Sequence, residues 1–297
     1  MKNVIRVRAF AKINCGLKIL GQRPDGYHEI RTVYQTVALH DRLEVSLRRP
    51  GCGLEVECDE PTVPLGRGNL VFRACDLWQN ARGFRGGMRV SLRKRIPPGS
   101  GLGGASSDAA ATLLGLERLT GDRLGPAVRF ALAAQLGSDV PLFLWGGRVL
   151  GCGRGEEVYP LVDFPLRHCL VVFPDFAVST AEAYREWSSQ LTKKRKAPSM
   201  DSFGAWPHLP LMSWGPAEND FEQVVFAKWP ELARLKRRLI RAGAETASLT
   251  GSGSALYALF PLARQLVHAS KLIPEGWRSF RTRTLSRARY QRLLYKQ

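Results

Sequence analysis

Short segments in which apolar and polar residues alternate fill the N-terminal third of the chain, a pattern typical of half-buried strands. Residues with turn chemistry separate these segments, as at 23–26 (Arg-Pro-Asp-Gly) and 49–51 (Arg-Pro-Gly). The pattern predicts strands at residues 4–7, 13–20, 33–39, 43–47, 54–58 and 88–93. One helix is predicted among them at 69–81, where Asn69 can cap a stretch with an apolar face.

In the middle of the chain, the sequence pattern predicts helices. Residues 106–119 are rich in Ala and Leu and stop before Gly121, whereas residues 126–136 begin with Pro and stop at Gly137. Further elements are expected as strands at 170–173, 247–249 and 255–260 and as helices at 218–229, 231–242 and 262–272. Residues 193–216 contain four prolines and no periodicity, so we expect an exposed connection there.

Strands that come first and mixed elements that follow favour an α+β fold with a domain boundary near Phe164. We therefore expect one domain at 1–163, a second at 164–280 and a basic tail at 281–297. The composition supports a folded chain, because apolar residues make up 44% and charged residues 24% of its 297 positions.

The formal charge of +18 is concentrated partly in two short segments, so it says less about the folded body than its size suggests. It arises from 44 Lys and Arg against 26 Asp and Glu, but residues 193–196 contribute +4 and residues 271–297 contribute +7. The remaining body is moderately basic, which suits a phosphorylated small molecule as well as a nucleic acid. A nucleic-acid-binding function is the weaker alternative, because the basic tail holds few aromatic residues, namely Trp277, Phe280, Tyr290 and Tyr295.

The distribution of apolar residues and cysteines bears on location. No apolar stretch approaches the roughly 18–20 residues of a membrane span, and the N-terminus lacks the apolar core of a signal peptide. The six cysteines form no CxxC pair and have no His at zinc-ligand spacing. We therefore expect a cytoplasmic protein with buried or idle thiols and no membrane partner.

The strongest chemical signal is a glycine-rich loop between a predicted strand and a predicted helix. Its glycines permit positive φ angles, and the N-terminus of the following helix adds positive potential, so the loop can hold phosphates. The alternative is a flexible turn with Ser106 or Ser107 as an ordinary helix cap. The loop comprises Pro97, Pro98, Gly99, Ser100, Gly101, Leu102, Gly103, Gly104, Ala105, Ser106 and Ser107.

Three common phosphate-binding motifs do not fit this loop. A dinucleotide-binding fold needs a second strand that ends in an acidic residue about 20 positions later, but helices follow here. A Walker A loop needs Gly-Lys-Ser or Gly-Lys-Thr, and no Lys follows the glycines. The His-Arg-Asp and Asp-Phe-Gly motifs of protein kinases are absent from the sequence as well.

The loop resembles instead the nucleotide loop of the GHMP kinases, which phosphorylate small molecules with ATP. Other segments continue the resemblance over about residues 4–260: AKIN at 11–14, PDGYHEI at 24–30, GSDVPLF at 137–143, VSTAEAY at 178–184, ENDFE at 218–222 and TGSGS at 250–254. The resemblance implies a two-domain α+β fold, with an N-terminal half like the second domain of ribosomal protein S5 and a ferredoxin-like C-terminal half.

The same segments narrow the implied reaction within the family. They imply ATP-dependent phosphorylation of the 2-hydroxyl of a cytidine-diphosphate-linked polyol, a step in non-mevalonate isoprenoid precursor synthesis. Homoserine and mevalonate are the alternative acceptors within the family, and the motif at 24–30 argues against them because neither carries a cytosine to stack.

The resemblance also implies roles for individual residues. Asp139 is the base that takes the hydroxyl proton, and Lys12 pairs with it and stabilises charge near the γ-phosphate. The implied substrate contacts are Asn14, Tyr27, His28, Thr180 and Tyr184, and the glycine loop with Asn69 and Leu70 lies on the ATP side. From the residues alone, plainer roles stay open. They are a turn residue for Asp139, an exposed strand Lys for Lys12, turn packing for Tyr27 and His28, a helix cap and core for Asn69 and Leu70, and a hairpin turn at 250–254.

Mg²⁺ is expected as the companion of the ATP phosphates, although no set of metal ligands is recognisable in the sequence. Asp139 or Ser107 can approach such an ion, and neither is assigned as its ligand. We expect a monomer or a weak homodimer. The connection at 193–216 and the tail from Arg281 exceed what the family needs. We expect them to be solvated surface, with an oligomer contact or an RNA-binding accessory as the alternatives.

Overall fold

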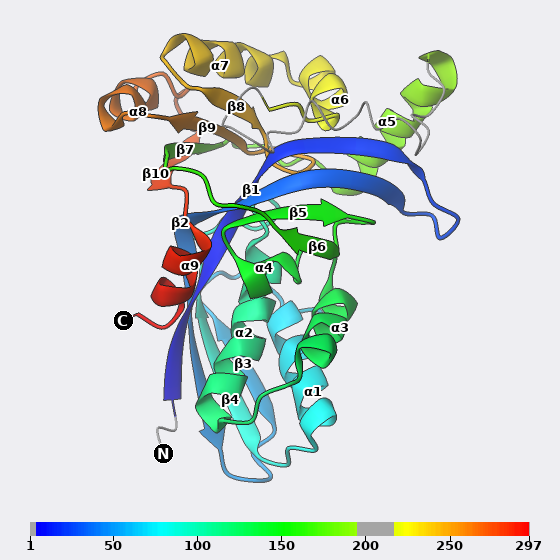
Figure 1. The fold of residues 1–297 in the computed structure, drawn as a ribbon, viewed down its shortest axis with the longest axis vertical. Coiled ribbons are helices and arrows are strands. Elements are labelled where there is room, and N and C mark those ends of the chain that lie inside the picture. Colours follow the sequence, from blue (N-terminus) through cyan, green and yellow to red (C-terminus); the bar gives the residue numbers. More distant parts are fainter. Residues whose placement is uncertain (1–3, 195–216, 297) are drawn as a thin grey trace.

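The computed structural model describes residues 4–194 and 217–296, which form two sheets with helices packed on them (Figure 1). The larger sheet has the strand order β3-β4-β2-β5-β6, with β1 paired to β2. The smaller sheet has the order β10-β7-β9-β8. The strands of the larger sheet are β1 (Val4–Gln22), β2 (His28–Arg48), β3 (Leu54–Cys58), β4 (Gly87–Arg93), β5 (Arg148–Cys152) and β6 (Glu157–Pro160).

The two longest strands, β1 and β2, form one antiparallel hairpin that reaches across the molecule (Figure 1). Each merges two strands that the sequence pattern predicts separately. The alternation of polar and apolar residues fails between them because the middle of β1, including Ala9, Phe10 and Ala11, is buried on both faces. The prediction of separate strands was therefore wrong at this point.

Helices α1 (Leu70–Arg82), α2 (Gly104–Thr120) and α3 (Pro126–Leu136) pack beside the larger sheet, followed by the short α4 (Leu142–Trp145). The bounds of α3 and β3 agree with the predicted ones, since Pro, Gly and alternation mark them clearly. Trp78, Leu113 and Leu116 are fully buried in the core that these helices share with the sheet.

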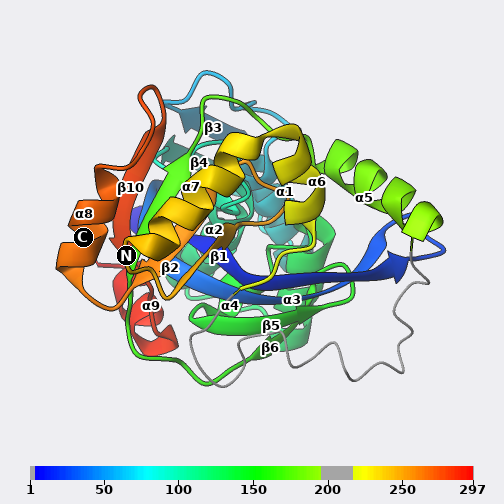
Figure 2. The ribbon, with the colours of Figure 1, turned by 90° about the horizontal axis from the view of Figure 1, so that it is seen from above.

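Most of the other helices lie on the outer face of the smaller sheet and at its end (Figures 1 and 2). Leu17, Ile19 and Ile30 from the β1–β2 hairpin are buried in the same core as this sheet, so the hairpin belongs to both halves. The elements here are β7 (His168–Phe173), α5 (Thr180–Lys194), α6 (Phe221–Lys228), α7 (Pro230–Arg241), β8 (Thr246–Leu249), β9 (Leu256–Phe260), α8 (Ala263–Ser270) and β10 (Arg278–Arg283).

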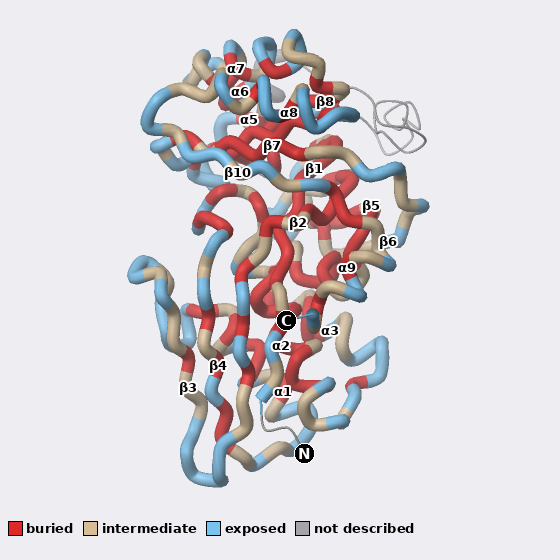
Figure 3. Tube along the Cα trace, turned by 90° about the vertical axis from the view of Figure 1, so that its left-hand side faces the viewer, coloured by how far each residue is buried: buried red, intermediate tan, exposed pale blue. Residues whose placement is uncertain are grey.

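The C-terminal segment folds back onto the N-terminal half as α9 (Arg287–Leu294). Leu285, Tyr290 and Leu294 are buried in the core of that half, whereas the basic residues of α9 are exposed or only partly buried (Figure 3). The expectation of a solvated tail thus differs from the structure, because Leu285, Tyr290 and Leu294 form an apolar face toward the core. The hydroxyls of Tyr290 and Tyr295 also donate to carbonyl oxygens of α4 and α2. Residues 195–216 of the expected connection lie outside the described residues.

Helix α5 was not expected from the sequence, in which no helix is predicted between residues 136 and 218. Its polar character hides the apolar positions Ala183 and Trp187, which are buried against the smaller sheet's core. Over residues 4–194 and 217–296, none of the helices combines the length and the apolar character that a membrane crossing requires.

Candidate active site

The glycine loop has the backbone geometry that its sequence predicts. Gly99, Gly101 and Gly103 have φ angles of 68°, 76° and 72°, values that favour glycine. Gly103 is the N-cap of α2 and provides no side-chain bond, so the alternative in which Ser106 or Ser107 caps the helix is wrong. The first N–H groups of α2 are therefore free of a side-chain cap, and a phosphate can accept from them.

Close contacts hold this loop between the two halves of the molecule. The Lys12 N–H on β1 donates to the carbonyl oxygen of Leu102 at 2.9 Å, and the Thr250 hydroxyl donates to the carbonyl oxygen of Gly101 at 3.0 Å. A Cβ atom at Gly101 would lie 2.3 Å from the carbonyl oxygen of Thr250. Glycine is thus required at position 101 for two reasons: the positive φ angle and the close contact with the Thr250 backbone.

Replacement of Gly101 by Ala is expected to raise the KM for ATP at least tenfold and to lower the melting temperature, because the methyl group displaces the Thr250 turn. Gly99→Ala is the matched control, since Gly99 has a similar positive φ but a Cβ atom there would have no other atom within 4 Å. It experiences only the backbone strain of about 1–2 kcal/mol. Initial-rate kinetics and thermal unfolding of both variants measure the difference. Equal effects at the two positions would contradict a role for the close contact between Gly101 and the Thr250 carbonyl oxygen.

Asp139, in the segment before α4, meets Lys12 beside this loop. The Lys12 Nζ lies 3.2 Å from Oδ2 of Asp139, and the Tyr34 hydroxyl donates to Oδ1 at 3.0 Å. The side chain of Lys12 is 4% exposed and that of Asp139 is 31% exposed. The carboxylate is therefore held by two donors from the buried side and is open to a ligand on the other.

Tyr34, on β2, was missed by the sequence analysis because nothing distinguishes it from a core residue of an alternating strand. Burial, followed by the nearby charge of Asp139, raises the pKa of its phenol well above the usual value. The phenol therefore keeps its proton and acts as a hydrogen-bond donor to the carboxylate at ordinary pH.

Asn14 joins the hairpin to the turn at 250–254. Its Oδ1 accepts from Lys12 Nζ and from the Gly251 N–H, each at 2.8 Å, while its amide nitrogen donates to Thr32 Oγ1 at 2.8 Å. The turn at 250–254, whose role was left open by the sequence, is thus part of the site. Its Ser252 hydroxyl also lies 2.8 Å from the Thr180 hydroxyl at the start of α5.

A pocket of about 730 Å³ opens beside Asp139. Most of the residues predicted for the substrate face this pocket, together with Ser106 from the N-terminus of α2. Arg154 and Arg185 line it as well and were not predicted, because single arginines give no signal in a chain of this charge. The predicted residues that line it are Tyr27, His28, Ser106, Asp139, Thr180 and Tyr184.

The aromatic residues of the pocket are arranged differently from the expectation. The His28 ring stacks directly on Tyr184, with centroids 4.5 Å apart and planes at 21°, and its Nε2 lies 2.9 Å from Ser188 Oγ. Tyr27 is 56% exposed and lies under the guanidinium of Arg154 at 4.7 Å. Burial lowers the pKa of His28 below its usual value, so the ring is mostly neutral at pH 7 and can both donate and accept.

Asn69 and Leu70 lie at the start of α1 and are not among the residues that line this pocket. Asn69 Oδ1 accepts from the Val71 N–H at 2.8 Å, and its amide nitrogen donates to the Pro64 carbonyl at 2.7 Å. Leu70 packs against the core of the larger sheet. The structure thus gives Asn69 a capping function, and contact of these two residues with adenine stays a prediction.

Beneath the loop, Lys94 lies between two buried carboxylates, Asp41 and Asp108. The Asp41 carboxylate also accepts from the Ile96 N–H at 2.8 Å and so anchors the chain as it enters the loop. Burial, and then the charge of Asp41, raises the pKa of Asp108 to about 8. One lysine cannot neutralise both acids, and a proton on Asp108 balances the charge.

Asp108→Asn, which imitates the protonated acid, is expected to stabilise the protein increasingly as the pH rises. The pKa is raised on folding from about 4, so wild-type stability falls between about pH 4 and pH 8, whereas that of the variant does not. We expect a difference of at least about 1 kcal/mol at pH 8 and little at pH 4. Denaturant unfolding at the two pH values measures it, with the surface variant Asp122→Asn as control. A difference that does not change with pH would contradict the assignment.

Metal ligands are sparse in this region. Within the part of the chain that the structure describes, no group of three or more His, Cys, Asp and Glu side chains is placed to hold a metal ion. Asp139 is the only carboxylate among the described residues that line the pocket. The buried hydroxyl of Ser107, at the N-terminal end of α2, has no hydrogen-bond partner within the described structure.

Two family models match the chain. The GHMP kinases N terminal domain matches residues 69–147, which include the glycine loop and Asp139, and the GHMP kinases C terminal domain matches residues 210–272. These matches agree with the two sheets of the fold and with the mixed α+β architecture predicted from the sequence.

Curated relatives are similar over nearly the full length. The 4-diphosphocytidyl-2-C-methyl-D-erythritol kinase of Solibacter usitatus is 44% identical over 97% of this chain and 90% of its own length. The enzyme of the same name from Pelotomaculum thermopropionicum is 41% identical over 86% of this chain and 89% of its own.

Solved structures extend the comparison to the fold. A crystal structure of 4-(cytidine 5'-diphospho)-2C-methyl-D-erythritol kinase matches with a TM-score of 0.77 and 34% identity, over 94% of this chain and 99% of that one. The homoserine kinase of Cytophaga hutchinsonii, at 19% identity and a TM-score of 0.67, covers 96% of each chain and shows the shared fold alone.

Proposed function

This chain belongs to the GHMP kinase family, and we propose that it transfers the γ-phosphoryl group of ATP to the 2-hydroxyl of 4-diphosphocytidyl-2-C-methyl-D-erythritol, a step in non-mevalonate isoprenoid precursor synthesis. The observation that carries the proposal is the pocket that unites Asp139, the N-terminal end of α2 and the His28–Tyr184 pair. A general base, a phosphate site and a site for a flat base are the parts that this reaction needs.

Asp139 is proposed as the general base. Its carboxylate is open to the pocket, so a substrate hydroxyl can donate to it and lose its proton as the new O–P bond forms. Tyr34 and Lys12 hold the two oxygens from behind, which fixes the direction of the carboxylate. Lys12 also brings a positive charge next to the loop, where negative charge develops on the transferred group. ATP supplies the electrophilic phosphorus when bound.

Cytosine recognition is assigned to the aromatic end of the pocket. A flat base can insert beside Tyr184, and the neutral imidazole of His28 can exchange hydrogen bonds with its polar edge. Tyr27 with Arg154 forms the exposed rim, where the arginine adds positive charge for a diphosphate. Asn14 and Thr180 are proposed to orient the polyol through the network at the turn.

Mg²⁺ is proposed to accompany the nucleotide. The available donors fit an ion that takes one or two protein ligands and is otherwise bound by phosphates and water. Among the described residues at the pocket and the loop, these donors are the Asp139 carboxylate and the unpartnered Ser107 hydroxyl. The ion neutralises phosphate charge when bound.

Other expectations remain part of this proposal. We propose domains at 1–163 and 164–280 with a C-terminal segment at 281–297, with the β1–β2 hairpin shared between the two cores. A cytoplasmic location accords with the six cysteines, which are all free thiols. A monomer or weak homodimer stays the proposed state.

The test is an ADP-release assay of the purified full chain with the cytidyl substrate, mevalonate and homoserine offered separately. We expect turnover with the cytidyl substrate only, and an increase of about 5- to 150-fold in its KM for Tyr184→Ala, since base stacking on an aromatic residue contributes about 1–3 kcal/mol. The exposed Tyr159→Ala on β6 is the matched control. No turnover of the cytidyl substrate, or faster turnover of another alcohol, would overturn the proposal.

A further inference from the structure

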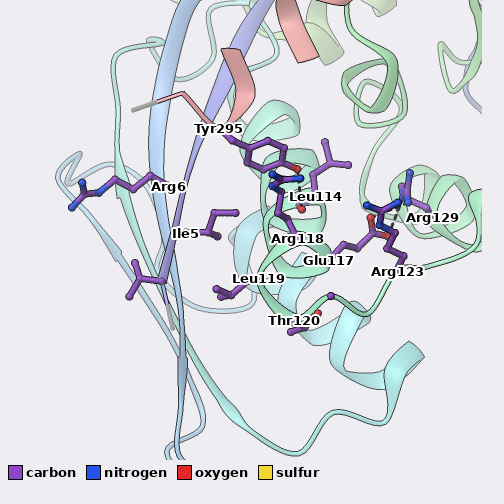
Figure 4. Close-up of a pocket in the computed structure, with 12 residues that line it drawn as sticks. Ile5, Arg6, Leu114, Glu117, Arg118, Leu119, Thr120, Arg123, Arg129 and Tyr295 are labelled. Carbon is purple, nitrogen blue, oxygen red and sulfur yellow. Dashed lines mark hydrogen bonds and ion pairs between the residues drawn. The ribbon is translucent and has the colours of Figure 1, made fainter. Parts of the chain in front are cut away.

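A second concave site lies at the end of α2 that is remote from the glycine loop. Its volume is about 840 Å³, and it lies between the last turn of α2, the start of β1 and the C-terminal Tyr295 (Figure 4). Because α2 has 17 residues, its two ends are about 25 Å apart. This distal cavity is therefore separate from the pocket that contains Asp139, and the two have no lining residue in common.

The lining of the distal cavity carries an excess of positive charge. The residues that contribute it are Arg6, Arg118, Arg123 and Arg129, with Glu117 as the one carboxylate among the described residues of the lining. Arg6 is paired with Glu44, at 2.9 Å, on the neighbouring strand. The other three arginines come from α2, the following loop and α3, and all three line the cavity (Figure 4).

Glu117 does not neutralise this group, because its carboxylate is already engaged. It is almost fully buried, pairs with Arg129 at 2.9 Å and accepts from the Leu124 N–H at 2.9 Å. Arg118 and Arg123 are exposed, and no carboxylate among the described residues pairs with either within 4.0 Å. Two guanidinium groups of the lining thus have no carboxylate partner among the described residues.

Tyr295 lines the cavity and packs directly against α2. Its hydroxyl donates to the Leu114 carbonyl at 3.1 Å, and the Arg118 guanidinium lies 4.9 Å from its ring centroid. Burial, and to a smaller extent the charge of Glu117, raises the pKa of this phenol, and the charges of Arg118, Arg129 and Arg123 act in the opposite direction. All three arginines therefore act electrostatically on one point of the cavity wall.

Part of the cavity lining is apolar. Ile5, Leu114 and Leu119 contribute to it between the charged groups. A cavity of this size that combines an apolar surface with convergent polar groups is typical of small-molecule sites. A simple inorganic anion would leave this surface uncovered, whereas an organic phosphate would cover it.

We propose that the distal cavity binds a small phosphorylated metabolite, with Arg118 and Arg123 holding its phosphate or diphosphate and the apolar residues of the lining covering its organic part. Planar guanidinium groups bind phosphate oxygens in pairs, which gives both charge compensation and orientation. The site goes beyond the proposed kinase reaction and needs no residue of the pocket that contains Asp139.

Calorimetric titration of the full chain with inorganic pyrophosphate tests the anion-binding part, with a saturating non-hydrolysable ATP analogue present to fill the proposed nucleotide site. We expect binding at low salt that weakens as salt is added. The double variant Arg118→Ala/Arg123→Ala is expected to bind at least tenfold more weakly. Arg234→Ala/Arg238→Ala, which removes two exposed arginines from α7, should change the affinity by less than twofold.

Several results would overturn this proposal. They are no pyrophosphate binding, binding that the ATP analogue abolishes, and equal losses in the two double variants. If the alanine variant fails to fold, Arg118→Gln/Arg123→Gln preserves much of the length of both side chains and provides the same comparison. ADP release with the cytidyl substrate is measured in parallel and should be unchanged without pyrophosphate, so failure of the kinase proposal is seen separately.

Discussion

Replacement of Asp139 by Asn is expected to lower kcat about 100- to 10,000-fold, the usual contribution of a positioned general base. The amide cannot take a proton from the substrate hydroxyl, yet it keeps the size of the carboxylate and its contact with Tyr34. The KM for both substrates should change little, because Asp139 acts on the reacting proton more than on binding. Steady-state rates of ADP release provide the measurement.

Two comparisons sharpen this experiment. Asp122→Asn removes a surface carboxylate that pairs with Arg82 far from the pocket, and it should leave kcat unchanged. The double variant Lys12→Met/Asp139→Asn tests whether the two groups act as a pair. Its loss of transition-state stabilisation, as a free energy, should not exceed the sum of the losses in the two single variants. An Asp139→Asn variant with wild-type kcat would contradict the assignment of the base.

Replacement of Tyr290 by Ala is expected to destabilise the protein by about 3–5 kcal/mol, as does truncation of other large buried aromatics. The ring is 2% exposed, lies 5.3 Å from Phe10 between ring centroids, and its hydroxyl donates to the Phe143 carbonyl at 2.6 Å. Its contact with Gly146 leaves no room for a Cβ atom there, since such an atom would lie 2.2 Å from the ring.

Denaturant unfolding measures this loss, and two variants separate its parts. Tyr290→Phe removes only the hydrogen bond and should cost about 1 kcal/mol. Arg292→Ala, on the exposed side of the same helix, should change the free energy of unfolding by less than about 0.5 kcal/mol. A loss at Tyr290→Ala as small as that at Arg292→Ala would mean that α9 does not contribute to the core.

The elements with strong local signals were predicted well. Helix α3 begins at Pro126 and ends before Gly137, and the structure has the same bounds. Helices α5 and α9 were missed, because a polar or basic sequence hides the few apolar positions that these helices bury. The long strand β1 was divided in two, because burial on both faces removes the alternation on which the prediction depends.

Much of the candidate site followed from local motifs, and the remainder did not. The glycine loop, Asp139, His28 and Tyr184 could be named from the sequence and from its resemblance to a family. Tyr34 could not, since its contact with Asp139 depends on how β2 lies against the segment before α4. Arg154 likewise could not be named, because its assignment to the site depends on its position over the Tyr27 ring.

The sequence by itself determined the conformation of the glycine loop and the helices whose ends carry Pro or Gly. These properties depend on neighbours along the chain, and local sterics encode them. Only the tertiary structure decided that Thr250 reaches Asn14 across 236 positions and that the basic C-terminus covers the N-terminal core. Such contacts arise when buried surfaces from distant segments pack together, and no local pattern specifies which segments will meet.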